Sequence, residues 1–512
     1  MPIANPDINA PLASPQTLFI NANVVGWPPG IYAVLVLGGR VAIVSRGLVV
    51  PEADMQVVDV CGAWIAPSLV DWHTHFTSAA VHMRRLSLAG YPSAAVALKV
   101  VNMALRTPEH DECGTFVAVG MRPGAWADAA ILDRGALDAL SSKPLVLFFF
   151  GNHSLVANSA ALGLVGIDAP DGRLFEADAF ALSIKLGEME DAEVVDGWVG
   201  ELAADIAKLG VTEIVDLEMA ANVAPWQRRC AKGFDALRVH IGFYPPHLDD
   251  AVARGYKTGA PVPHTNGLVD IGPFKIITDG ALSSMTAYCK APYTNTCNRG
   301  ALNYTPEEID ALCLKATKTG LRLAVHAIGD EALALVVNAL GRHAAAGHPP
   351  RAGSTIEHAM LVDAPEVPRM AALGLTASVQ PRHLVEDIEI AHARWTGREH
   401  MAFPYRTLLD AGVPLRFGSD TPVSPIQPWE AMACAMSREG FGEVFEPQER
   451  LSAAQAFAAS TWNGRVDIAE GERADLIIVD ADPLTLNAEG MRKISVLATM
   501  LAGRWTYRAK RP

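Results

Sequence analysis

The sequence has no block of basic residues and no apolar run long enough to cross a membrane. Its 512 residues include 42 Lys and Arg against 56 Asp and Glu, which gives a formal net charge of −14. Because nucleic-acid binding requires a basic face that neutralises phosphates, nucleic acid is not expected as a partner. The densest apolar run, residues 144–151, is far shorter than a bilayer span, so no membrane partner is expected either.

Cysteine is scarce and irregularly placed. The seven cysteines are scattered, odd in number and include no Cys-x-x-Cys pair. This usage is typical of a reducing compartment and predicts neither a disulfide framework nor a thiolate zinc site. Residues 1–7 also lack the charged and apolar regions of a secretory signal. We therefore expect a cytoplasmic protein.

The central part of the chain alternates apolar strands with helical stretches. Half of the residues are hydrophobic, which is enough for a large buried core. The alternation favours βα units and a parallel sheet, hence the α/β class. Eight predicted strands, the number that closes a TIM-like (β/α)8 barrel, lie at 65–72, 211–217, 237–243, 274–278, 321–325, 354–357, 375–379 and 413–417.

Short strand patterns also occur at both ends of the chain. We expect residues 1–64 and 466–512 to form one small β-sandwich domain beside a barrel of residues 65–465. Within the barrel region, the segment 76–210 is too long for one βα connection and contains its own predicted strand at 144–150. We interpret it as a large insertion after the first strand, a lid or subdomain over the barrel mouth.

Polar residues that could bind a metal follow several of the predicted barrel strands. His73 and His75 lie one residue apart, so in an extended strand they project from one face, although two histidines at a strand end could also be structural. His326, His358 and Asp420 follow the fifth, sixth and eighth strands, whose ends form the catalytic face of a barrel. Because imidazole and carboxylate ligands suit zinc, the set predicts a divalent metal site.

Together with Lys275 on the fourth strand, these residues resemble the ligand set of the amidohydrolase superfamily. Longer segments are similar to its family 3 branch, which contains N-substituted formamide deformylase. The similarity extends over nearly the whole chain, and the segments that carry it are 151–160, 275–282, 326–330, 356–358, 377–383 and 418–425.

The resemblance implies a metal centre of one or two ions, expected to be Zn²⁺. An ammonium has no lone pair, so Lys275 would bind metal only as a carbamate, the form that the resemblance implies. An ion pair of Lys275 with Asp279 or another carboxylate stays open as an alternative. The implied metal ligands are His73, His75, Lys275, His326 and His358.

The resemblance also implies a catalytic carboxylate. Asp420 would accept a proton from the attacking water and pass it to the leaving nitrogen. Candidate substrate contacts, each with a surface or structural role as the alternative, are Asp279, Gln380 and His383 near the strand ends and His153, with Asn152, on the insertion.

Two further residues have weaker predictions. Glu357 immediately precedes His358, so it should face the other side of its strand and pair structurally. His240 is a further candidate for the pocket.

The function implied by the resemblance is hydrolysis of a linear C–N amide bond, with an N-substituted formamide or N-acyl amine as the small-molecule substrate. A deaminase or cyclic-amide hydrolase of the same superfamily stays an alternative, because these enzymes share the metal site. A non-catalytic barrel scaffold would show lost ligands, whereas every ligand position is occupied here. A homodimer is expected only as the habit of the superfamily.

Overall fold

The computed structural model describes residues 16–47, 49–53, 55–107, 114–151 and 153–509. The chain divides into two compact units. The first comprises the described parts of Met1–Thr74, Leu202–Asp420 and Ser424–Pro512. The second comprises those of His75–Glu201 and Thr421–Val423.

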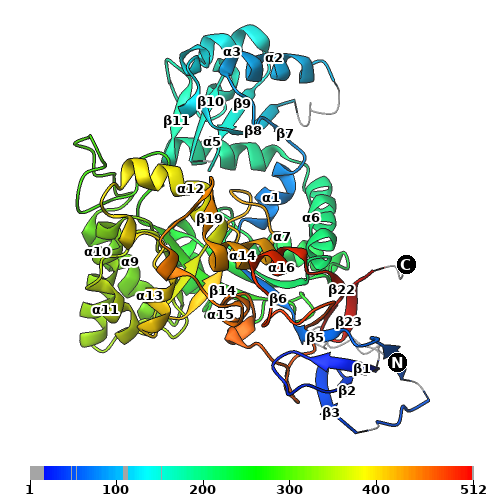
Figure 1. Cartoon of the computed structure of the whole chain (residues 1–512). Helices are drawn as coiled ribbons and strands as arrows, with labels where there is room; N and C mark the ends of the chain where they lie inside the picture. Colours follow the sequence, from blue (N-terminus) through cyan, green and yellow to red (C-terminus); the bar gives the residue numbers. More distant parts are fainter. Residues whose placement is uncertain (1–15, 48, 54, 108–113, 152, 510–512) are drawn as a thin grey trace. The chain divides into compact units, whose positions relative to one another are not determined.

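The centre of the first unit is a sheet of eight parallel strands whose spatial order follows the chain (Figure 1). Its register places Lys275 opposite Ala324 and His326 opposite Glu357. The strands confirm the predicted (β/α)8 barrel. They are β6 (Leu69–Thr74), β12 (Val211–Asp216), β13 (Arg238–Phe243), β14 (Val269–Ile277), β15 (Leu323–Ala327), β16 (Thr355–His358), β17 (Thr376–Val379) and β18 (Leu415–Phe417).

The chain after the last barrel strand, β18, packs closely against the first, β6, at Gly418. The Asp420 N–H donates to the His73 carbonyl at 2.7 Å, and the Ser419 N–H donates to Asp71 Oδ1 at 2.9 Å. A Cβ on Gly418 would lie 2.5 Å from the His73 Cβ, so only glycine allows this approach. The residues that follow β18 are therefore held beside the end of β6.

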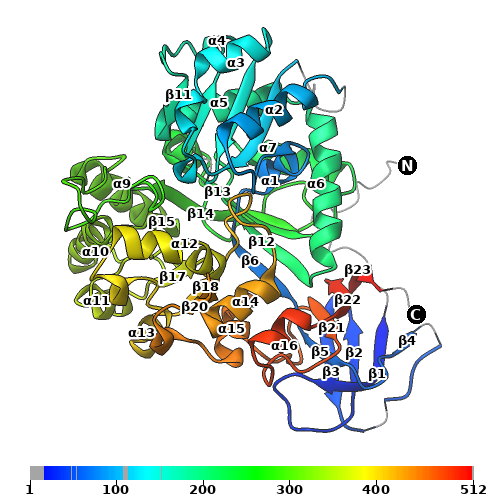
Figure 2. The ribbon, with the colours of Figure 1, turned by 45° about the horizontal axis from the view of Figure 1, so that its top comes forward.

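Helices cover the outside of the barrel sheet (Figure 2). The helix α9 shows how the sequence sets their limits, because Thr305 and Glu308 form a capping box at its start and Gly320, at φ +82°, ends it. The helices of this unit are α7 (Val223–Ala231), α8 (Leu248–Ala253), α9 (Pro306–Thr319), α10 (Asp330–Ala345), α11 (Glu366–Ala372), α12 (Pro381–Arg394), α13 (Tyr405–Asp410), α14 (Pro428–Ser437), α15 (Ala453–Ala459) and α16 (Ala488–Lys493).

Strands from both chain ends form a second sheet of the first unit, visible in Figure 2 as blue strands beside red ones. The two ends share one buried core, which includes Phe19, Val34, Ile65, Leu476 and Met500. The pairing order is β23-β22-β21-β5-β1-β2-β3, with β4 on β1. The strands are β1 (Thr17–Val24), β2 (Tyr32–Leu37), β3 (Arg40–Ser45), β4 (Gln56–Asp59), β5 (Trp64–Pro67), β21 (Leu476–Val479), β22 (Val496–Leu501) and β23 (Arg504–Arg508).

The predicted first barrel strand, 65–72, is two strands. β5 pairs with β1 and β21 in the terminal sheet, whereas β6 pairs with β12 in the barrel. Ser68 stands between them, and its hydroxyl lies 2.6 Å from the Thr212 hydroxyl. Apolar residues continue from β5 into the start of β6 on both sides of Ser68, so hydrophobic pattern alone did not indicate where the chain changes sheet.

The second unit contains a five-stranded sheet with helices packed on both faces. Alternate residues of β9 enter different cores: Leu147 packs with α2 and α3, whereas Val146 and Phe148 pack with α4 and α5. The strand predicted at 144–150 is thus confirmed, and the other four were not predicted. The sheet contains β7 (Leu86–Ser87), β8 (Phe116–Met121), β9 (Leu145–Phe149), β10 (Ser154–Ala157) and β11 (Arg173–Phe175).

The helices of the second unit are α1 (Phe76–His82), α2 (Ala94–Ala104), α3 (Arg134–Leu140), α4 (Ser159–Gly163) and α5 (Glu176–Met189), while α6 (Ala192–Ala207) runs across the boundary of the units in the sequence. Among the described residues, every helix is too short or too polar to span a bilayer.

Candidate metal centre

Three predicted site residues meet at the carboxyl ends of barrel strands. His73 lies on β6, His358 ends β16, and Asp420 follows β18. One possible ligand atom from each lies within 4.8 Å of the others, and all three side chains are buried. Two imidazoles and a carboxylate are a donor set that zinc and similar divalent metals accept, so these residues fit a metal ion.

Two of these residues have an unusual backbone conformation. His358 has φ +70° and Asp420 has φ +58°, both in the left-handed region that residues other than glycine seldom adopt. Ala359, next in the chain, has φ +44°. Such conformations cost free energy and persist where the surroundings impose them, commonly at functional sites.

Glu357 pairs structurally, as predicted, and the left-handed turn at His358 explains why the predicted direction of its side chain was wrong. Glu357 does not face away from the site, because its Oε2 lies 2.6 Å from Nδ1 of His73. The His73 and His358 rings are themselves neighbours, with centroids 5.1 Å apart. Strict alternation along β16 ends at its last residue, so Glu357 and His358 both reach His73.

Glu357 sets the orientation of the His73 ring. An ionised carboxylate only accepts hydrogen bonds, so Nδ1 of His73 donates to it and Nε2 keeps its lone pair. That Nε2 lies 3.3 Å from Asp420 Oδ1 and 3.2 Å from Nζ of Lys275. Burial and then the neighbouring lysine hold the pKa of His73 below its usual value, which favours the neutral imidazole.

Gln380 sets the orientation of the His358 ring. Its Oε1 lies 2.8 Å from Nδ1 of His358, and its Nε2 donates to the Ser378 carbonyl at 3.3 Å. The amide oxygen therefore accepts from Nδ1 and leaves Nε2 of His358 to bind a metal. Burial, then the neighbouring His326, holds the pKa of His358 well below its usual value. The predicted contact of Gln380 with substrate stays a prediction.

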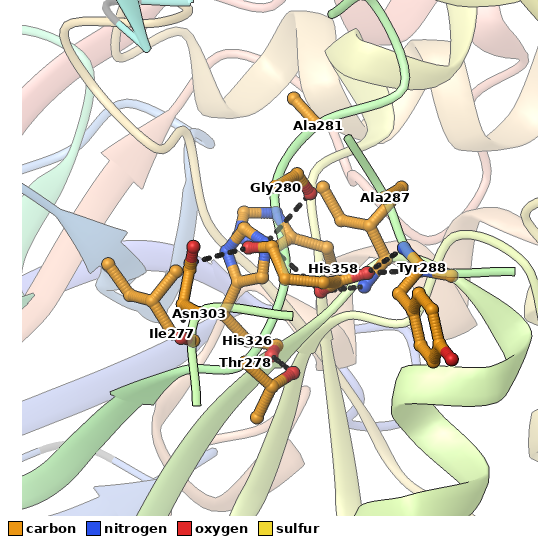
Figure 3. Close-up of polar contacts among 12 residues, drawn as sticks. Ile277, Thr278, Gly280, Ala281, Ala287, Tyr288, Asn303, His326 and His358 are labelled. Carbon is orange, nitrogen blue, oxygen red and sulfur yellow. Dashed lines mark hydrogen bonds and ion pairs between the residues drawn. The ribbon is translucent and has the colours of Figure 1, made fainter. Parts of the chain in front are cut away.

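His326 lies against His358 but is directed differently. The two ring centroids are 4.4 Å apart (Figure 3). Nε2 of His326 lies 3.2 Å from the Gly280 carbonyl and 3.5 Å from Asp279 Oδ1. The structure thus brings His326 beside the centre, while the three-residue donor set does not include it. Its role as a ligand stays a prediction.

Asp279 holds the backbone around His326 in place. Its carboxylate accepts the N–H groups of Ile328 at 3.1 Å, and of Gly329 and Tyr288 at 2.9 Å each. A fully buried carboxylate with three backbone donors fixes the loop that follows β15. These contacts explain a structural role for Asp279, and its predicted contact with substrate stays a prediction.

Lys275 is buried beside His73 without a carboxylate partner. Its side chain is 2% exposed, and in the described part of the chain it takes part in no ion pair, with Asp279 or otherwise. Burial lowers its pKa, an effect that the charges of Glu357 and Asp420 only partly offset. The alternative of a Lys275–Asp279 ion pair is therefore wrong for this structure, and carboxylation of Lys275 stays a prediction.

His383 stands at the first turn of α12, next to the centre. Its ring stacks parallel to that of His358, with centroids 6.3 Å apart. Its Nε2 is buried and has no hydrogen-bond partner among the described residues. Buried polar atoms are seldom left in this state, so His383 keeps its place as a predicted substrate contact.

The remaining predicted residues are not part of the three-residue donor set. His75 and His153 belong to the second unit, where His75 occupies the N-cap position of α1 and Nδ1 of His153 lies 2.8 Å from Oε2 of Glu176. Their places at the metal centre and at the substrate stay predictions, and Asn152 lies outside the described residues. His240 is held between two carboxylates, with Nε2 2.7 Å from Glu213 and Nδ1 2.6 Å from Asp270.

Sequence reasoning missed Asp71, which supports the centre from β6. Its Oδ1 accepts the N–H groups of Ser419 at 2.9 Å and His73 at 3.2 Å, and so fastens β6 to the chain after β18. Burial raises the pKa of Asp71 to about 6 against the effect of these hydrogen bonds. The Asp-x-His spacing was the available signal, because it puts Asp71 and His73 on one face of the strand.

Comparisons with known proteins identify the family and the fold of this chain. The model of the amidohydrolase family matches residues 56–507. N-substituted formamide deformylase of Arthrobacter pascens is 29% identical over 526 residues, covering 93% of this chain and 94% of that protein. A metal-dependent hydrolase of Pyrococcus horikoshii shares the fold, with a TM-score of 0.75, 21% identity and coverage of 93% and 99%. The zinc complex of atrazine chlorohydrolase from Arthrobacter aurescens aligns with a TM-score of 0.55, 13% identity and coverage of 97% and 96%.

Proposed function

Because this chain belongs to the amidohydrolase family, we propose that it is a metal-dependent hydrolase that cleaves a linear C–N amide bond in a small molecule. The convergence of His73, His358 and Asp420 at the strand ends is the observation that carries the proposal. For the substrate we propose an N-substituted formamide or a related N-acyl amine, a choice supported by the name of the Arthrobacter pascens relative.

In this proposal one or two divalent ions, with zinc as the first candidate, occupy the centre. His73 and His358 offer Nε2 atoms, and His75, His326 and a carboxylated Lys275 complete the ligand set. When bound, the metal polarises a substrate carbonyl and lowers the pKa of water toward ~7. The Arthrobacter aurescens protein, which shares the fold, was solved with zinc.

The residues of the chain handle the protons. The Asp420 carboxylate accepts a proton from the attacking water and returns it to the leaving nitrogen, so that an amine departs rather than its anion. The contact of Asp420 Oδ1 with His73 Nε2, at 3.3 Å, supports this role, because it keeps the carboxylate beside the proposed ligands. Glu357 and Gln380 keep the two imidazoles oriented throughout.

Amine release from a substrate panel tests the proposal. The panel contains N-substituted formamides, N-acyl amino acids and cyclic amides, offered to zinc-loaded protein with bicarbonate and to a chelated control. Chelator-sensitive release from formamides or N-acyl amines is expected. Cleavage of cyclic amides alone would show that the substrate is a cyclic amide and not the proposed formamide or N-acyl amine. Metal-loaded protein that hydrolyses nothing on the panel would contradict the proposed reaction.

A further inference from the structure

A cavity of about 170 Å³ lies in the barrel, toward the strand ends opposite the metal centre. Arg322 and Gly353, which line it, precede β15 and β16, whereas His326 and His358 close these strands. Trp72 and Trp462 form part of its wall and stack on each other, with ring centroids 5.4 Å apart. A cavity of about 150 Å³ can hold a molecule as large as benzene, so this one has room for a small ligand.

Two guanidinium groups converge on one point of this cavity. A Cβ on Gly353 would lie 3.3 Å from Nε of Arg322 and 3.5 Å from Nη2 of Arg416. Gly353 thus leaves open the space where both groups meet. Like charges so placed repel each other, and burial makes the repulsion stronger.

Neither guanidinium is neutralised by a carboxylate within the described residues. Arg416 lies over the ring of Trp72 at 4.0 Å and donates to the Gly353 carbonyl at 3.4 Å. Nε of Arg322 is buried with no hydrogen-bond partner in the described structure. Burial, and then the charge of Arg322, lowers the pKa of Arg416 to about 10. Both groups thus retain hydrogen-bond donors without an acceptor of opposite charge.

The other charged groups of the cavity do not cancel the two arginines. Asp270 and Glu213 bond the two nitrogens of His240. Glu357, which also lines the cavity, bonds Nδ1 of the neutral His73 and the Thr355 hydroxyl, so it keeps a negative charge that acts on Arg416. Among the lining residues the three cations Arg322, Arg416 and His240 outnumber the two carboxylates Asp270 and Glu357, so the net charge of the cavity lining is positive.

We propose that this cavity binds a small oxyanion, a carboxylate or a phosphate, between Arg322 and Arg416. The planar fork of a guanidinium matches both anions in geometry, and one bound anion satisfies both groups. The site is distinct from the metal centre, and Glu357 is the residue that the two have in common.

Calorimetric titration of the zinc-loaded protein with inorganic phosphate and with acetate tests this proposal. Acetamide, the neutral counterpart of acetate, serves as the ligand control. We expect one or both anions to bind and acetamide not to bind. Arg322→Gln and Arg416→Gln should each weaken binding about 10-fold or more, because each removes a charged donor. Arg406→Gln, which removes an exposed arginine paired with Asp410, should leave binding unchanged.

Two further measurements distinguish binding between the two arginines from binding of the anion at the metal centre. Phosphate should protect Arg322 and Arg416, but not Arg406, from phenylglyoxal in the wild-type protein, which needs no variant to fold. Wild-type protein that binds neither anion at tens of millimolar would overturn the proposal. A second result would also overturn it: removal of zinc by a chelator abolishes anion binding, while both arginine variants bind the anion with wild-type affinity. That result would show that the anion binds at the metal centre.

Discussion

Replacing Glu357 tests how the metal centre is built. Its Oε2 accepts from Nδ1 of His73 at 2.6 Å, and its Oε1 accepts from the Thr355 hydroxyl. In Glu357→Gln the amide oxygen can still accept from His73, and the Thr355 hydroxyl can turn to accept from the new NH₂ group. The shape is kept and the charge is lost. Residues that orient a metal-binding histidine in this way contribute about 10- to 100-fold to metal affinity.

We therefore expect zinc affinity about 10-fold lower in Glu357→Gln and about 100-fold lower in Glu357→Ala, which leaves Nδ1–H without an acceptor. Competition with a chelator of known affinity measures both values. Glu213→Gln is the matched control, because Glu213 is another buried carboxylate bonded to a barrel histidine, away from the centre. Wild-type affinity in both Glu357 variants would refute the orienting role. An equal loss in Glu213→Gln would assign the effect to barrel stability instead.

Three further predictions follow from the site and from the barrel. Asp420→Asn should keep its zinc content but lower kcat by ~100-fold or more, whereas unchanged turnover would remove Asp420 from the mechanism. Zinc at 100 times its dissociation constant should raise the free energy of unfolding by about 2.7 kcal/mol, so chelation should lower Tm, and an unchanged Tm would contradict a site formed only in the folded state. Burial alone would lower the pKa of His240, but its hydrogen bonds with Asp270 and Glu213 raise it from 6.5 to about 9. Protonated His240 therefore contributes fully to the free energy of unfolding below pH 6.5, and this contribution is lost as pH rises through 9. In urea unfolding, the free energy by which wild type exceeds His240→Gln should fall by on the order of 3 kcal/mol between pH 6 and pH 10. A constant advantage would show that His240 is not protonated in the folded protein.

The barrel strands could be predicted because each is a short apolar run between helical stretches. The first strand was the exception, since apolar residues continue from β5 into the start of β6 and Ser68 alone separates the two sheets. The four other strands of the insertion were missed. β7 has only two residues and β11 has three, too short for alternation to show.

The sequence predicted those site residues that stand at the ends of barrel strands. The predicted side-chain direction was wrong where the backbone leaves the extended conformation. Alternation is consistent with Asp71 beside His73, but it put Glu357 on the wrong side, because nothing in the sequence announces φ +70° at His358. The sequence also did not indicate which side chains form hydrogen bonds with each other. Glu357 meets His73 across 284 positions of sequence, and such contacts exist only once the barrel has closed.

Two histidines of the barrel, His73 and His240, contact carboxylates with opposite consequences for metal binding. Both nitrogens of His240 face carboxylates, at 2.6 and 2.7 Å, and this favours the doubly protonated ring, which has no lone pair to offer. His73 also has a carboxylate near each nitrogen, Glu357 at 2.6 Å from Nδ1 and Asp420 at 3.3 Å from Nε2, but its Nε2 has the Lys275 amine at 3.2 Å as well, which opposes a second proton. The same two residue types thus favour a cation at His240 and a neutral imidazole, suited to bind a metal, at His73. The buried amine of Lys275 beside the His73 ring makes the difference, and its placement there is a property of the fold.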